Sequence, residues 1–109
     1  MQQPLFVPEA TWRPPNILPE LDTVISIDLE TCDPNLKLAG PGYKRNDGKV
    51  IGIAIADKHH TLYLPFDHLG GDNLDKRIIV SYVKNAISRC NEVIMANASY
   101  DLGWLGTLG

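Results

Sequence analysis

Apolar residues in the first half of the chain follow the two-residue period of β-strands. Residues 23–30 are rich in β-branched side chains and alternate at their end, so they predict a strand with at least one buried face. Residues 49–56 and 61–65 are two further apolar runs, and the polar residues 57–60 separate them. This arrangement predicts a β-hairpin, so we expect the first three elements to be strands.

A helical spacing replaces this period in the second half of the chain. Apolar residues recur at intervals of three and four between positions 74 and 87. They predict an amphipathic helix that ends near Arg89, with Asp72 or Asn73 as its N-cap.

A short strand and a further helix complete the predicted order of elements. Residues 92–96 predict the strand, and the pattern that begins at Asn97 predicts the helix. The resulting order of strand, strand, strand, helix, strand and helix indicates an α/β fold with an antiparallel opening and flanking helices.

Proline and glycine mark the segments without a periodic pattern. Residues 1–21 contain five prolines and predict an extended arm, so we place the folded domain at residues 22–109. Residues 33–48 contain three clusters of turn-forming residues and predict a long loop.

Basic residues gather around this predicted loop, at Lys37, Lys44, Arg45 and Lys49. These side chains could face phosphates. An ordinary solvated loop explains them as well and is the interpretation that the sequence favours.

Composition identifies one ordinary globular domain, with 109 residues, 44% hydrophobic and 21% charged. No apolar run approaches the ~20 residues of a membrane helix, and the first residues do not resemble a signal peptide. We therefore expect a cytoplasmic protein with no membrane partner. Cys32 and Cys90 have no second Cys or His at zinc-site spacing, so we expect reduced thiols.

The formal charge of −3 argues mildly against a nucleic-acid partner that electrostatics alone would hold. Bound divalent cations would reverse this argument, because a carboxylate cluster that has bound metal attracts phosphate. The acidic balance therefore leaves a nucleic-acid partner open.

Asp28 and Glu30 are the first candidate site residues. Alternate side chains of a strand share a face, so these two carboxylates are expected to point to one spot at the end of an apolar strand. Oxygen ligands of this kind suit hard divalent cations. An isolated Asp-x-Glu is more often the ordinary solvated end of a strand, so the pair alone is a weak signal for a metal site.

A second motif changes this balance. Residues 97–101, Asn-Ala-Ser-Tyr-Asp, follow the short strand and open the last helix. Together with residues 28–31, Asp-Leu-Glu-Thr, they resemble the first two motifs of the DEDD, or DnaQ-like, exonuclease superfamily. Residues 40–42, 47–54 and 63–68 are similar to the corresponding parts of the exonuclease domains of family A DNA polymerases, especially those of phages.

This resemblance covers about residues 22–109 and implies an RNase H-like fold with a 3′→5′ exonuclease activity. It implies that Asp28, Glu30 and Asp101 are catalytic residues that ligate two Mg²⁺ or Mn²⁺ ions, and that the partner is the 3′ end of single-stranded DNA. It also implies that Thr31 and Asn97 contact the substrate. Thr31 as a strand end and Asn97 as a helix cap or turn residue are equally good interpretations.

The third motif of this superfamily, a Tyr or His followed by a fourth Asp, has no counterpart in the sequence. We therefore expect the N-terminal part of a proofreading domain, incomplete at its C-terminus and inactive by itself, that belongs with the remainder of a DNA polymerase. A working exonuclease that takes its missing acid from elsewhere and a noncatalytic RNase H-like binding or interaction module are the alternatives.

Overall fold

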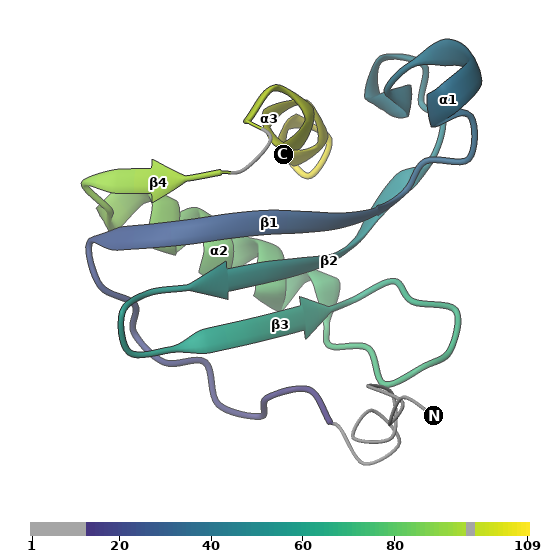
Figure 1. The fold of residues 1–109 in the computed structure, drawn as a ribbon. Coiled ribbons are helices and arrows are strands. Elements are labelled where there is room, and N and C mark those ends of the chain that lie inside the picture. The colour runs from purple at the N-terminus through teal and green to yellow at the C-terminus, as the bar shows by residue number, and fades with distance from the viewer. Residues whose placement is uncertain (1–12, 96–97) are drawn as a thin grey trace, which may run out of the picture.

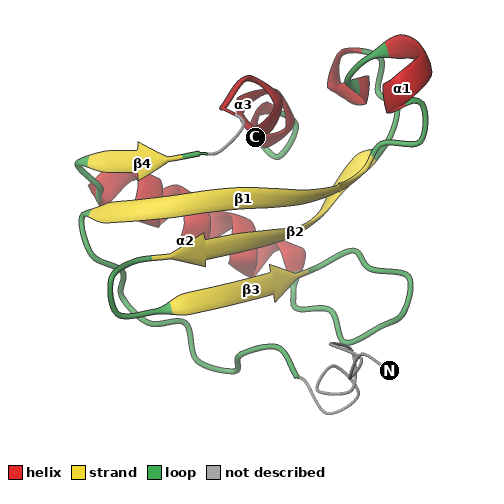
Figure 2. Cartoon of the chain, in the orientation of Figure 1, coloured by secondary structure: helices red, strands yellow, loops and turns green. Residues whose placement is uncertain are grey.

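The computed structural model describes residues 13–95 and 98–109, and every structural statement below concerns these residues. They form a single sheet with helices beside it (Figures 1 and 2). In chain order the elements are β1 (Val24–Cys32), α1 (Leu36–Ala39), the 3₁₀ helix η2 (Gly42–Lys44), β2 (Lys49–Ala56), β3 (Thr61–Pro65), α2 (Lys76–Arg89), β4 (Glu92–Ile94) and α3 (Ala98–Gly106).

The sheet has four strands in the order β3-β2-β1-β4. β2 is antiparallel to both β1 and β3, whereas β4 is parallel to β1. The predicted hairpin forms β2 and β3, and the backbone N–H of Asp57 donates to the carbonyl of His60 across its turn at 2.9 Å. The expectation of a mixed sheet with antiparallel opening strands and flanking helices is therefore confirmed.

α2 covers one face of the sheet (Figure 1). Ile25, Ile27 and Leu29 of β1 are buried in the same core as Ile79 and Val83 of α2. The alternation predicted for β1 and the apolar stripe predicted for α2 are thus the two sides of one core.

The N-cap of α2 differs from the prediction. The Asp75 side chain accepts hydrogen bonds from the backbone N–H groups of Arg77 and Ile78, so Asp75 is the cap, not Asp72 or Asn73. Asp72 has a positive φ of 55° and belongs to the preceding turn. The chain makes this additional turn before the helix begins, and residue spacing alone does not reveal it.

The segment before β1 runs along α2. Residues 13–21 contain no helix or strand, yet Leu21 is buried in the core and Tyr82 of α2 donates its hydroxyl proton to the carbonyl of Pro19. Glu20 forms an ion pair with Arg89 at the end of α2. Residues 1–12 of the predicted arm lie outside the described residues.

No helix among the described residues is long and apolar enough to cross a membrane. The described Cys32 and Cys90 are both free thiols.

Candidate functional site

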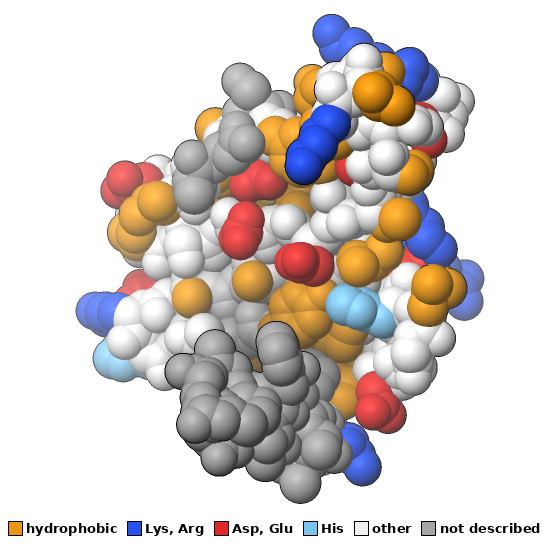
Figure 3. All heavy atoms as spheres, turned by 45° about the vertical axis from the view of Figure 1, so that its right-hand side comes forward, with side chains coloured by type: hydrophobic (Ala, Val, Ile, Leu, Met, Phe, Trp, Pro, Cys, Tyr) orange, Lys and Arg blue, Asp and Glu red, His pale blue; other side chains and the backbone are white. Residues whose placement is uncertain are grey.

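Asp28 and Glu30 lie on the face of β1 that α2 leaves uncovered. Their neighbours Ile27 and Leu29 are buried on the opposite face, as strand alternation requires. In the pairing of β1 with β2, Asp28 stands opposite Ala54 and Glu30 stands opposite Gly52. Both Asp28 and Glu30 are exposed. Figure 3 shows acidic side chains gathered across the middle of one face of the molecule.

Asp101 reaches this region from α3, at a gap in the pairing of the sheet. β4 pairs with β1 only up to Ser26, so no described strand pairs with β1 beyond Ser26 on that side. The N–H of Leu29 donates to the Asp101 carboxylate there. Asp101 is only 2% exposed, and its Oδ2 atom is buried without a hydrogen-bond partner among the described residues.

The electrostatics of Asp101 show which carboxylate lies beside it. Burial raises the pKa of the Asp101 carboxyl, the charge of Asp28 raises it further, and the hydrogen bond from Leu29 opposes both effects. The structure therefore brings Asp28 and Asp101 together, from strand β1 and helix α3.

Glu30 has a different neighbour. The Tyr63 side chain of β3 lies over Gly52, where a β-carbon would stand 2.3 Å from the phenol oxygen. Burial, followed by the charge of Glu30, raises the pKa of Tyr63 to about 12. The Tyr63 hydroxyl is hydrogen-bonded to Nε2 of His68 at 2.5 Å. Glu30 thus borders a Tyr–His pair on the open face of the sheet.

The donor atoms present suit a divalent cation in part. An unpartnered buried carboxylate oxygen beside a second carboxylate is the kind of oxygen donor pair that Mg²⁺ or Mn²⁺ binds. Residues 13–95 and 98–109 contain no group of three or more His, Cys, Asp or Glu side chains placed to hold a metal ion. Asp28 and Asp101 therefore fit as two ligands, and a third ligand is not in place among the described residues.

Of the two predicted substrate contacts, Thr31 and Asn97, only Thr31 lies among the described residues. The Thr31 hydroxyl lies 2.7 Å from the Tyr100 hydroxyl, which also donates to Oδ2 of Asp33 at 3.1 Å. The register of β1 shifts between Glu30 and Thr31, so Thr31 follows a local irregularity of the strand. Asn97 lies outside the described residues.

Residue spacing did not reveal the side chains that surround the carboxylates. Tyr63 belongs to the predicted strand 61–65, and Tyr63 and His68 lie in the segment 63–68 that resembles the exonuclease domains, but neither is predicted to lie beside Glu30. Gly52 is the available signal for Tyr63, because a glycine inside a strand marks a place where another group approaches closely.

No protein-family model matches the chain. The chain is 34% identical over 113 aligned residues to a protein of Pseudomonas phage M6 named DNA-directed DNA polymerase. The alignment covers 96% of this chain and 17% of the phage protein, so the chain spans about a sixth of that relative's length. This similarity supports a relation to one segment of a DNA polymerase.

Proposed function

We propose that this chain forms the N-terminal part of the 3′→5′ proofreading exonuclease domain of a DNA polymerase, with an RNase H-like fold. The observation that carries the proposal is the buried Asp101 carboxylate with an unpartnered oxygen beside Asp28. Similarity to a segment of a phage DNA polymerase supports the polymerase context. The mixed sheet with its antiparallel opening supports the fold.

Burial of Asp101 is costly unless the site binds a cation. A buried carboxylate oxygen without a partner costs about 1–3 kcal/mol, and a second negative charge nearby adds to this cost. A divalent cation removes both penalties, because it supplies positive charge to Asp28 and a ligand bond to Asp101. The buried Asp101 carboxylate beside Asp28 therefore destabilises the fold without a cation and favours the binding of one.

Asp28, Glu30 and Asp101 would hold Mg²⁺ or Mn²⁺ in this proposal. Such ions lower the pKa of water and stabilise charge on a leaving oxygen. In the overall reaction, water adds its oxygen to the terminal phosphorus and the bond from phosphorus to the 3′ oxygen breaks. The proton that water loses ends on that oxygen. A nucleoside 5′-monophosphate leaves, and the shortened strand keeps a new 3′-hydroxyl.

The protein's own groups would organise the substrate end. The Thr31 hydroxyl stands at the end of β1 directly after the carboxylates, and Tyr100 holds it in place through their mutual hydrogen bond. The open sheet face that carries Glu30 leaves room for the terminal nucleotide. Because the described residues hold no group of three ligands and the sequence has no counterpart of the fourth Asp, we expect the 109-residue chain alone to release little or no nucleotide.

The test compares the chain alone with a chimera in which it replaces the matching segment of the phage polymerase. A single-stranded oligonucleotide labelled at its 5′ end is incubated with Mg²⁺ or Mn²⁺, and its shortening is followed on a gel. We expect stepwise digestion by the chimera and loss of digestion, by a factor of at least about 10², in Asp28→Asn and Asp101→Asn chimeras.

Asp72→Asn is the matched control, because it makes the same substitution at an exposed aspartate between β3 and α2 whose carboxylate pairs with Arg13 at 3.9 Å. It should digest like the parent chimera. A parent chimera that folds and binds single strands without shortening them would overturn the exonuclease proposal. That result favours a noncatalytic binding module, the function that the incomplete ligand group also allows.

A further inference from the structure

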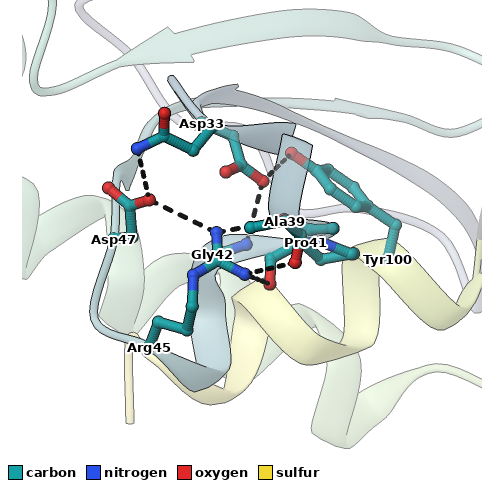
Figure 4. Close-up of polar contacts among 9 residues, drawn as sticks. Asp33, Ala39, Pro41, Gly42, Arg45, Asp47 and Tyr100 are labelled. Carbon is teal, nitrogen blue, oxygen red and sulfur yellow. Dashed lines mark hydrogen bonds and ion pairs between the residues drawn. The ribbon is translucent and has the colours of Figure 1, made fainter. Parts of the chain in front are cut away.

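Residues 33–48, here called the loop lobe, contain the short helices α1 and η2, whereas the sequence predicted a long loop. The Arg45 guanidinium donates to three successive carbonyls, those of Ala39 at 2.6 Å, Gly40 at 3.1 Å and Pro41 at 3.3 Å (Figure 4). These are carbonyl groups at and just after the end of α1. One side chain therefore satisfies the end of α1 and holds the chain reversal that follows it.

Two hydrogen bonds of the Asp47 side chain and one close backbone approach also hold the loop lobe together. Asp47 accepts from Asn35 at 3.0 Å and from Arg45 at 3.3 Å, which ties the two ends of the lobe together. A β-carbon on Gly42 would lie 1.9 Å from the carbonyl oxygen of Asp47, so this approach requires glycine. The loop lobe therefore has little conformational freedom to lose when it binds a ligand.

The loop lobe is anchored beside the carboxylates. Oδ2 of Asp33 accepts from the backbone N–H of Gly42 and from the hydroxyl of Tyr100, the residue before Asp101 (Figure 4). The Tyr43 ring packs edge-on against Trp104 of α3, with ring centroids 5.9 Å apart. The Tyr100 hydroxyl, which bonds both Thr31 and Asp33, thus links the end of β1 after Glu30 to the loop lobe.

The charge of this region is opposite to that of the whole chain. Residues 33–48 contain three basic and two acidic residues, a net charge of +1, and Lys49 follows at the start of β2, whereas the chain has a formal charge of −3. Arg45 is used inside the lobe, and Lys49 pairs with Asp67 at 3.2 Å. Lys37 and Lys44 are exposed and form no ion pair with any described residue. Figure 3 shows basic side chains around the upper part of the molecule, above the acidic side chains.

We infer that the loop lobe binds the sugar-phosphate backbone of a single-stranded nucleic acid, with Lys37 and Lys44 as the phosphate contacts. This inference rests on the proposed function, because it concerns the strand whose 3′ end would enter the carboxylate site. The carboxylates repel a polyanion, so a strand needs cationic contacts next to them. Leu38, 89% exposed in α1, offers an apolar surface to an unstacked base.

The experiment measures fluorescence anisotropy of a labelled 12-nucleotide oligothymidylate with the 109-residue chain in EDTA, at several salt concentrations. EDTA removes divalent ions, so binding reports the lobe and not the carboxylate site. We expect the double variant Lys37→Gln and Lys44→Gln to bind more weakly. The slope of log K against log salt should fall by about 1.4, since each phosphate contact on a single strand contributes about 0.7.

The matched control is Lys58→Gln with Lys84→Gln, which removes the same charge from the β2–β3 turn and from α2. It should leave the slope unchanged. Equal losses in the two double variants, or no loss in either, would overturn the inference, because binding would then follow only total charge or other residues.

This measurement is independent of hydrolysis. Lysine-dependent binding in EDTA together with an inactive chimera would leave the loop lobe as a binding surface and refute the exonuclease proposal. A digesting chimera whose binding and digestion are both insensitive to Lys37 and Lys44 would refute the loop lobe and leave the exonuclease proposal standing.

Discussion

Asp101 of α3 lies beside Asp28 of β1, where burial and then the charge of Asp28 raise the pKa of the Asp101 carboxyl. A carboxyl whose pKa is raised on folding stabilises the protein at low pH, and this stability is lost as pH rises through the folded pKa. The ionised form at neutral pH is therefore a cost to the empty fold.

Asp101→Asn should accordingly be more stable than the parent chain at pH 7, by about 1–3 kcal/mol in the absence of metal. The gain should shrink as pH falls toward 3.8, the ordinary pKa of the group. Urea unfolding of both proteins from pH 4 to pH 7 measures this difference. A gain that stays constant across this range would contradict the structural assignment.

Bound Mn²⁺ should make the parent chain more stable than Asp101→Asn. If Asp28 and Asp101 bind Mn²⁺, a metal concentration 100 times Kd adds about 2.7 kcal/mol to the parent chain, or about 10 °C in Tm. Thermal melting with and without Mn²⁺ checks this shift. Asp28→Asn and Asp101→Asn should lose the shift, whereas Asp72→Asn should keep it, and an identical response in all four proteins would exclude the site.

Asp57 makes a separate, opposite contribution to pH dependence. Burial tends to raise its pKa, but hydrogen bonds from the N–H groups of Asp22, His59 and His60 and from the His60 ring hold the pKa well below its usual range. A depressed pKa stabilises the fold above the ordinary pKa, and this stability is lost in acid. Asp57→Asn should therefore be less stable at pH 7 and lose less stability between pH 5 and pH 3, as measured by urea unfolding.

The helix cap gives a stability test that does not depend on function. Asp75→Ala removes the side chain that accepts from Arg77 and Ile78, so the free energy of unfolding should fall by about 1 kcal/mol. Asp72→Ala places alanine at a residue with a positive φ but removes no cap. Far-UV circular dichroism of the folded variants, which measures total helix content, separates the two, because only Asp75→Ala should shorten α2. Equal helix content in both variants would contradict the assignment.

The contact between the loop lobe and α3 is tested by adding one methyl group. A β-carbon on Gly103 would lie 2.3 Å from the Tyr43 ring, so Gly103→Ala should displace the ring and destabilise the fold by about 1–3 kcal/mol. Tyr43→Ala, which removes the obstacle, should make Gly103→Ala nearly neutral. Urea unfolding of the two single variants and the double variant measures this coupling. Strictly additive losses would show that the two residues do not meet.

The sequence by itself determined the four strands, the helices α2 and α3 and the faces of the strands, but not the short helices α1 and η2. The alternation along β1 places Asp28 and Glu30 opposite the buried Ile27 and Leu29, and residue spacing alone reveals this because a strand has a period of two. The hairpin and the helix α2 follow from equally local patterns.

Only the tertiary structure decided which groups meet the two carboxylates. Asp101 reaches Asp28 because β4 stops pairing at Ser26 and leaves the Leu29 N–H to the Asp101 carboxylate. Glu30 faces Tyr63 because Gly52 lets that ring lie over β2. Both contacts depend on where strands end and how close backbones approach, which are properties of packing between distant segments and leave no period in the sequence.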